Sequence, residues 1–302
     1  MKLIDHRTSS GSCEVRHLTD ICYLLRREQG ASAHLYVLLD ATVGISSHFD
    51  PHEPEDQWEI KVDGFGKAPL RLLRLGPGYE ESLRVSAKQC RLARRDHRRA
   101  SVVAWIVAPQ PPSDVAATLR RLLENEKRSG SENPMPMMDS MSVPHWPYAL
   151  SDQQRHLLSR SGLRIACLGF AGELCWMAQP QTELEPLHMH ARGVFKLARV
   201  TLVNHAAKVL NGLGGYDIDL ERAHHFAASV IANVRRRNVL DQAMLVAHDI
   251  ALNCELHCAP ALRALIADTP EHETALAQAL GQLDQSQLEC IRDSLFRMHR
   301  ER

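Results

Sequence analysis

The stretch HLYVLLDAT, residues 34–42, decides how the N-terminal half of the chain is interpreted. It is short and continuously apolar from Leu35 to Leu39, which favours a strand buried on both faces. The strand ends on an acid, Asp40, which could be a catalytic or metal-binding carboxylate. It could also cap the next turn or pair with an arginine such as Arg71 or Arg74. Because lone acids at strand ends are common, we expect the structural role.

Other short apolar runs follow this strand and are separated by helical patterns. Strands are expected at 58–62, 70–75 and 101–109, and as two segments within 164–179. Helices are expected at 18–30, 80–99, 113–128 and 151–162. Strands that alternate with helices predict a sheet layered with helices.

The pattern changes after Pro180 and is helical from residue 189 to the end. We therefore predict an α+β or α/β fold, with a mixed sheet and flanking helices in residues 1–182 and an all-helical lobe in residues 183–302. Asp217 or Asp219 should open the second helix of this lobe, Asp241 should cap the third, and Pro260 should start another segment. Residues 271–299 should form one long helix, or two broken near Gln285.

The composition is that of an ordinary globular protein, with 44% hydrophobic and 24% charged residues. Lys plus Arg number 36 and Asp plus Glu number 36, so the formal net charge is zero, which argues against a dedicated nucleic-acid binder. No run reaches 18 apolar residues, and the first residues have no signal-peptide pattern, so we expect a cytoplasmic protein without membrane contact. The eight cysteines are expected to be free thiols, mainly buried.

A basic run, RVSAKQCRLARRDHRR, occupies residues 84–99. On a helix, five of its cations would line one face: Arg84, Lys88, Arg91, Arg95 and Arg98. These are the candidate partner-binding residues, because such a face can dock an acidic protein or phosphates. It can equally be a solvated face that is balanced by acids such as those of the 53–56 loop. The lack of interleaved aromatic residues weakens recognition of nucleic acid.

Motifs for cofactor or metal chemistry are weak. Cys254 and Cys258 have His248 and His257 nearby, but a structural zinc site needs tighter ligand spacing and a second ligand pair. The glycines of GFGK (64–67) do not follow the phosphate-loop pattern. We therefore predict no metal and no cofactor.

The order of several segments resembles the type VI secretion system effector adaptor or chaperone family. In the N-terminal part the resemblance rests on LYVLLDA, APLRLLRL, VVAWIVAPQPPSDVAATLRRLL, ALSDQQRHLLSRSG and GELCWMA. In the C-terminal part it rests on NVRRRNVLDQAMLVAHDIALNCELHCAPALRALIAD. One segment departs from the pattern: the family usually has an aromatic-Asp-Pro-Arg stretch, whereas PMPMMDSMSVPHW retains only Asp139.

The resemblance implies a non-catalytic protein with an N-terminal α/β domain and a C-terminal helical region. Such adaptors bind a toxic effector and load it onto the spike protein of the secretion system, so the expected partners are these two proteins. Two alternatives remain open. One is a hydrolase or transferase that uses Asp40 or Asp139 with a histidine. The other is a nucleic-acid-binding regulator that uses the face within 84–99.

Overall fold

The computed structural model describes most of the chain. The described residues are 12–13, 18–29, 33–43, 57–60, 70–76, 80–96, 98–127, 139–150, 152–170, 172–177, 193–212, 218–234, 238–270 and 275–300. The chain divides into two compact units, Met1–His190 and Ala191–Arg302. The predicted boundary at 182/183 and the division at 190/191 both fall in 178–192, outside the described residues. The acidic loop 53–56 and the GFGK stretch also lie outside them.

The first unit is built on a seven-stranded sheet in the order β1-β7-β6-β5-β2-β4-β3. Every pair of neighbouring strands is antiparallel. The strands are β1 Ser12–Cys13, β2 His34–Asp40, β3 Gln57–Ile60, β4 Leu70–Leu75, β5 Val102–Ala108, β6 Arg164–Leu168 and β7 Leu174–Trp176. The stretch HLYVLLDAT thus forms β2, near the middle of the sheet, and the first two residues of η1.

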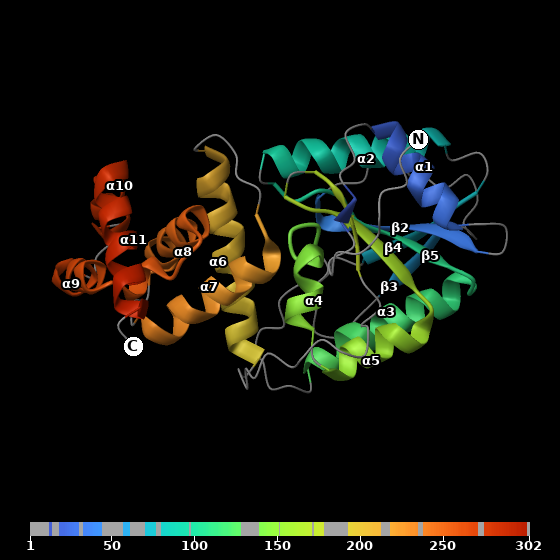
Figure 1. Cartoon of the computed structure of the whole chain (residues 1–302). Coiled ribbons are helices and arrows are strands. Elements are labelled where there is room, and N and C mark those ends of the chain that lie inside the picture. Colours follow the sequence, from blue (N-terminus) through green and yellow to red (C-terminus); the bar gives the residue numbers. More distant parts are fainter. Residues whose placement is uncertain are drawn as a thin grey trace. The chain divides into compact units, whose positions relative to one another are not determined.

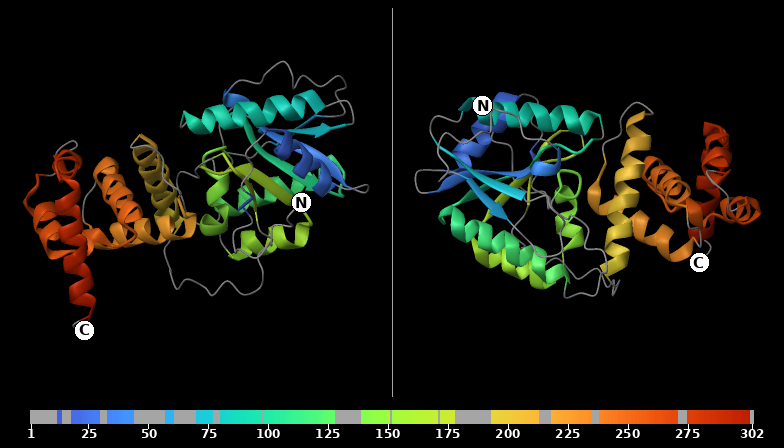
Figure 2. Two further views of the ribbon diagram at one scale, coloured as in Figure 1. Left: turned by 45° about the horizontal axis from the view of Figure 1, so that its top comes forward. Right: turned by 180° about the vertical axis from the view of Figure 1, so that it is seen from behind.

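Helices cover both faces of this sheet (Figures 1 and 2). Helices α1 (Leu18–Gln29) and α2 (Glu80–Arg95) lie on one face, and α3 (Pro112–Lys127) and α5 (Asp152–Ser161) lie on the other. The described residues of the unit also form three short helical segments: η1 Ala41–Val43, η4 Val143–His145 and α4 Trp146–Ala149.

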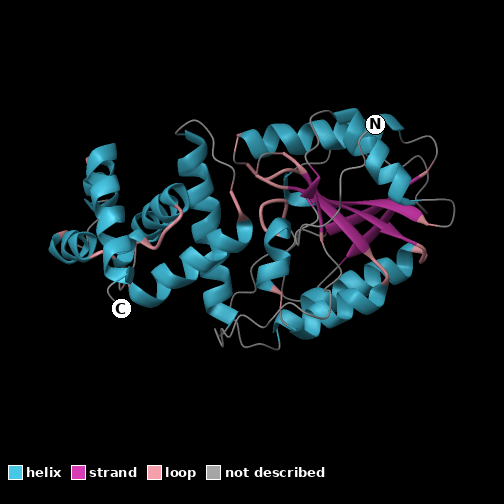
Figure 3. Cartoon of the chain, in the orientation of Figure 1, coloured by secondary structure: helices cyan, strands magenta, loops and turns pink. Residues whose placement is uncertain are grey.

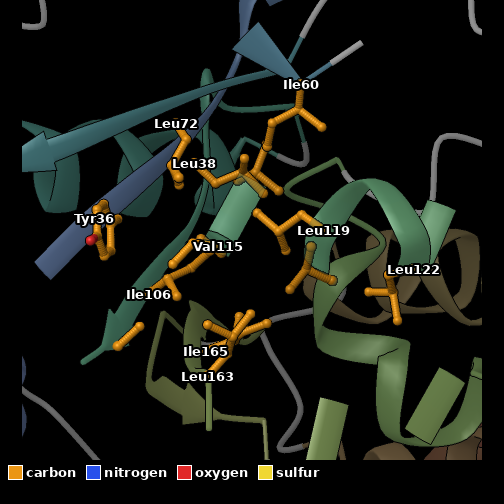
Figure 4. Packing of buried hydrophobic residues seen from close by; sticks show 14 of the residues in the cluster. Tyr36, Leu38, Ile60, Leu72, Ile106, Val115, Leu119, Leu122, Leu163 and Ile165 are labelled. Carbon is orange, nitrogen blue, oxygen red and sulfur yellow. The ribbon is translucent and has the colours of Figure 1, made fainter. Parts of the chain in front are cut away.

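Two apolar clusters fill the spaces on either side of the sheet, because alternate residues of each strand face opposite ways. In β2, Tyr36 and Leu38 join the cluster beneath α3 and α5, seen in Figure 4, whereas Leu35 and Val37 join the cluster beneath α1 and α2. All four are 0% exposed. The continuous apolar run therefore reflects burial on both faces, as predicted.

The second unit consists of helices in its described residues (Figure 3). They are α6 Gly193–Gly212, α7 Leu220–Asn233, α8 Val239–Leu252, η5 Leu256–Cys258, α9 Pro260–Asp268, α10 Ala275–Gly281 and α11 Gln285–Arg300. The break near Gln285 is real, because Asp284 and Gln287 form reciprocal bonds of 2.8 and 2.9 Å at the start of α11.

Two other predicted helix starts can be compared directly. Asp219 caps α7, since its side chain accepts hydrogen bonds from the N–H groups of Glu221 and Arg222. The cap of α8 is Asn238, whose Oδ1 accepts the N–H of Leu240 at 2.8 Å. The prediction that Asp241 caps this helix is therefore wrong. Asp241 lies in the first turn, where it is 1% exposed.

The predicted α+β class is confirmed, with strands and helices in the first unit and helices in the second. The described strand pairs are antiparallel, where the prediction was a mixed sheet. The predicted helix at 80–99 is shorter and ends at Arg95. None of the helices in the described part of the chain combines the length and apolar character that a bilayer crossing requires.

Candidate functional site

Asp40 caps the turn that follows β2. Its Oδ1 accepts hydrogen bonds from the Thr42 N–H at 2.9 Å and the Thr42 hydroxyl at 2.5 Å. The backbone N–H of Asp40 donates to the Ser101 carbonyl at 2.7 Å, which ties the end of the strand to the start of β5. The expected capping contact is therefore present, and it leads the chain into η1.

The arginine beside Asp40 is Arg99, and not Arg71 or Arg74. Arg99 Nη2 lies 2.5 Å from Asp40 Oδ2, and Arg99 Nε lies 3.5 Å from Asp139 Oδ2. The two acids singled out from the sequence thus share one guanidinium. The Arg99 side chain is 43% exposed, whereas the Asp40 and Asp139 side chains are 6% and 10% exposed. The bridge therefore lies at the margin of the unit, where water reaches the cation.

Asp139 also organises its own segment. Its Oδ1 accepts the N–H groups of Met141 at 2.8 Å and Ser142 at 2.7 Å, which starts the turn that leads into η4. In PMPMMDSMSVPHW, Asp139 is the only residue that matches the aromatic-Asp-Pro-Arg stretch of the adaptor family that the chain resembles. Its described arginine partner, Arg99, comes from a distant part of the sequence.

A second arginine, Arg94, anchors the same segment from α2. It is 4% exposed and donates to the Ser140 carbonyl and, at 3.1 Å, to the sulfur of Met141. Its guanidinium lies 5.7 Å from the centre of the Phe170 ring. Burial lowers the pKa of Arg94, as expected for a cation removed from water. The Ser140 hydroxyl in turn accepts the Ala100 N–H at 2.7 Å.

These contacts join the end of β2, the start of β5, the end of α2 and the segment that begins at Asp139. We call Asp40, Arg94, Arg99 and Asp139 the arginine–carboxylate junction. Among the residues that the structure describes, the hydrogen bonds and ion pairs of Asp40 and Asp139 involve no histidine. The buried His145 instead has its ring edge-to-face with Phe170, with 5.6 Å between centroids. The junction is built to hold four chain segments together.

The five cations of the predicted basic face differ in their exposure and position in the structure. Arg84, Lys88 and Arg95 lie on the outside of α2 and are exposed. Arg91 is half-buried beside Gly172, where a Cβ would lie 3.6 Å from Arg91 Nε. Arg98 lies beyond the end of the helix. The opposite side of α2 is buried through residues that include Leu83, Ala87, Cys90 and Arg94.

The cations on the outside of α2 differ in their partners. Arg84 donates twice to Glu81, at 2.6 and 2.9 Å. Arg95 and Arg98 share Asp96, at 3.3 and 2.7 Å, and these bonds lower the pKa of Asp96. No described residue forms an ion pair with Lys88.

Leu92 also lies on this side and is 41% exposed. At 100° per residue it points almost directly away from the buried side of α2. We call Arg84, Lys88, Leu92 and Arg95 the outer stripe of α2.

The helical unit contains a buried polar network that the sequence did not indicate. The His257 and Asp249 side chains are both 0% exposed, and His257 Nδ1 lies 2.6 Å from Asp249 Oδ2. The other ring nitrogen, Nε2, lies 3.2 Å from the Ser229 hydroxyl. Asn233 donates to that hydroxyl, also at 3.2 Å. The network links α7, α8 and η5.

The sequence of contacts from hydroxyl to imidazole to carboxylate is also that of a serine-hydrolase triad. Ser229 lies within α7, however, and the backbone N–H groups of a helix interior are used by the helix itself. A donor for an oxyanion would have to come from a side chain, and Asn233 is one such donor. The described geometry therefore supplies a buried base and its buried orienting acid beside a partly buried serine.

The thiols give no metal site within the described residues, where no group of three His, Cys, Asp or Glu side chains could hold an ion. Cys254 follows α8 and Cys258 lies in η5, so the two do not share a helix face. Among the described residues, seven cysteines are free thiols. Burial raises the pKa of Cys90 and of Cys167 to about 12, which makes both unreactive.

The described residues thus form an antiparallel α+β unit with an arginine–carboxylate junction, followed in the chain by a helical unit. No protein-family model, curated protein sequence or solved structure matches the chain.

Proposed function

We propose that this chain is a non-catalytic, cytoplasmic adaptor that binds a type VI secretion effector and helps load it onto the spike protein. The observation that carries the proposal is where the family-like segments fall. LYVLLDA lies on β2, APLRLLRL on β4, and VVAWIVAPQPPSDVAATLRRLL on β5 and α3. The resemblance therefore concerns the framework of the unit, in the family's order, and not a single loop.

Further along the chain, the segments that resemble the family also coincide with strands and helices of the structure. ALSDQQRHLLSRSG covers α5, GELCWMA contains β7, and the long C-terminal segment runs from the end of α7 through α9. Several segments that resemble the family in one order are less readily matched by chance than a single short motif, and this favours the adaptor assignment over a nucleic-acid-binding regulator.

The arginine–carboxylate junction gives further support for a non-catalytic role. The oxygens of Asp40 and Asp139 accept backbone, hydroxyl and guanidinium groups. A general base needs access to a substrate proton, and the described contacts of both carboxylates are with donors of the protein itself.

Co-purification tests the proposal. The full chain is expressed with the effector-like protein encoded beside its gene, and separately with the matching spike protein. We expect a stable complex with the effector at micromolar concentration. Binding of neither protein at that concentration would refute the adaptor assignment. Omission of the effector gene provides the control for non-specific capture of the spike protein.

A second candidate function, hydrolysis, is favoured by the Ser229–His257–Asp249 network alone. It predicts covalent labelling of the full chain by a fluorophosphonate probe, lost in Ser229→Ala and in His257→Gln. The adaptor proposal predicts no labelling of the native chain above that of Ser229→Ala. Mass spectrometry of the labelled peptide decides between the two.

A further inference from the structure

The outer stripe of α2 has a composition that suits a particular kind of partner. Its four residues are spaced at three to four positions, so its three cations and Leu92 recur on one side of the helix over three turns. Lys88 has no ion-pair partner among the described residues, and Arg95 shares its only described carboxylate with Arg98. The side chains of Arg84 and Arg95 are 62% and 74% exposed, so their charges face solvent.

An apolar side chain lies among these cations. Leu92 is 41% exposed and follows Lys88 by four residues, so the two side chains are neighbours on the helix surface. A surface that combines cations with one exposed leucine can bind both parts of an amphipathic ligand. The carboxylates of the ligand would meet the cations, and an apolar residue would cover Leu92.

Two features favour an acidic protein segment over nucleic acid. First, Glu81 and Asp96 lie at the two ends of the stripe and would repel a continuous row of phosphates, whereas a peptide can place its acids between them. Second, the residues of α2 include no aromatic side chain on which bases could stack. The zero net charge of the chain also gives little long-range attraction to a polyanion.

We propose that the outer stripe of α2, formed by Arg84, Lys88, Leu92 and Arg95, docks an acidic amphipathic helix of a partner protein. This inference rests on the proposed adaptor function for its setting, and it adds the chemistry of the bound segment. The helical periodicity of the stripe matches a ligand whose acidic and apolar residues recur at three to four positions.

A peptide-display experiment tests the inference without knowledge of the natural effector. A phage library of random 20-residue peptides is selected on the immobilised full chain. We expect enriched peptides to carry an excess of Asp and Glu, with apolar residues at helical spacing. A synthetic copy of the leading peptide should bind with a Kd that rises about tenfold for Lys88→Glu/Arg95→Glu and for Leu92→Asp. Arg84 is left intact because Glu81 already holds it.

A matched charge reversal on another helix is the control. Arg120→Glu/Arg121→Glu changes two exposed arginines of α3, which lies on the other face of the sheet. This variant should bind the peptide with a Kd within twofold of the parent chain. Circular dichroism of each variant verifies that it is folded.

Three results would overturn the inference: no enrichment, enrichment of non-acidic peptides, or unchanged affinity of the α2 variants. A 20-nucleotide single-stranded oligonucleotide that competes with the peptide at equal concentration would instead assign the stripe to phosphates. The outcome is separate from that of co-purification. An effector that binds the α2 variants as tightly as the parent would leave the adaptor function standing and remove only this docking site. Selection of acidic peptides by a chain that binds no effector would support the docking site and refute the adaptor function.

Discussion

Both units place a carboxylate beside a basic side chain, but at different depths. In the first unit, Met1–His190, which we call the α/β unit, Asp40 lies beside an Arg99 side chain that is 43% exposed. In the helical unit, Asp249 meets His257 with both side chains at 0% exposure. Water can screen and replace the first contact, whereas the second has only protein groups around it. We therefore expect loss of a partner to be mild at the first site and severe at the second.

The chain provides a direct way to measure this difference, because its four tryptophans all belong to the α/β unit. They are Trp58, Trp105, Trp146 and Trp176. Tryptophan fluorescence therefore reports unfolding of that unit, and far-ultraviolet circular dichroism reports both units. Urea titrations followed by the two signals separate the effects of one variant on each unit.

The largest effect is expected for Asp249→Ala. This change leaves His257 Nδ1 without its partner and removes the acceptor of the His257 backbone N–H. The free energy of unfolding of the helical unit should fall by about 3–5 kcal/mol. The dichroism midpoint should move to lower urea while the fluorescence midpoint stays constant. Asp293→Ala in α11, with a side chain 55% exposed, is the control. A loss below 1 kcal/mol for Asp249→Ala would contradict the comparison.

Arg94→Met should have the next largest effect, and in the α/β unit. The change leaves the Ser140 carbonyl without its guanidinium donor and removes the cation beside Phe170. We expect a loss of about 2–4 kcal/mol, seen in the fluorescence midpoint. Arg94→Lys should recover little of it, because an ammonium lacks the planar fork that reaches several partners. Full recovery by lysine would show that charge alone matters at this position.

Asp40→Asn tests the exposed half of the comparison. The asparagine oxygen can still accept the Thr42 N–H, whereas its amide nitrogen replaces the Oδ2 that accepts from Arg99, so the ion pair and its hydrogen bond are lost. We expect a loss of about 0.5–1 kcal/mol. A double-mutant cycle with Arg99→Gln should give a coupling energy below about 1 kcal/mol. A coupling of 3 kcal/mol or more would mean that the bridge behaves as a buried pair.

The smallest effect concerns pH and His248 of α8. Its Nε2 is buried without a described partner, and burial lowers the pKa of the imidazole. A lowered folded-state pKa means that the unfolded chain binds the proton more readily. The stability from neutral His248 is therefore present above about pH 6.5 and declines as the pH falls below that value.

In His248→Gln, the dependence of the dichroism midpoint on pH should become shallower below about pH 6.5. The change in slope cannot exceed about 1.4 kcal/mol per pH unit for a single proton. Burial raises the pKa of Asp249, but that group is present in both proteins and cancels in the difference. Parallel curves for the two proteins would contradict the prediction.

The strands and helices that could be predicted from the sequence are those identified by a pattern of neighbouring residues. Strands β2 and β5 were recognisable because burial on both faces requires an unbroken apolar run. The start of α8 was assigned to the wrong residue because Asn238 and Asp241, three residues apart, are both acceptable at a helix N-terminus. Local preference cannot rank two such neighbours, and packing decides between them.

The junction and the His257 network could not be predicted, since they join residues far apart in the sequence. Arg99 is 59 positions from Asp40, and Ser229 is 28 positions from His257. Arg94 did carry a local signal, because it falls on the apolar side of α2 with Leu83, Ala87 and Cys90. A charged residue in that position indicates a buried partner, but its identity depends on tertiary structure.

The order of strands in the sheet has a consequence for synthesis of the protein. Strand β1, made first, pairs with β7, which is among the last parts of the α/β unit to leave the ribosome. The four strands from β2 to β5 are adjacent in the sheet and lie within residues 34–108, so they can assemble earlier. A nascent chain that has not yet exposed Leu174–Trp176 therefore has no site for Ser12–Cys13, so this edge of the sheet cannot close until β7 has been synthesised.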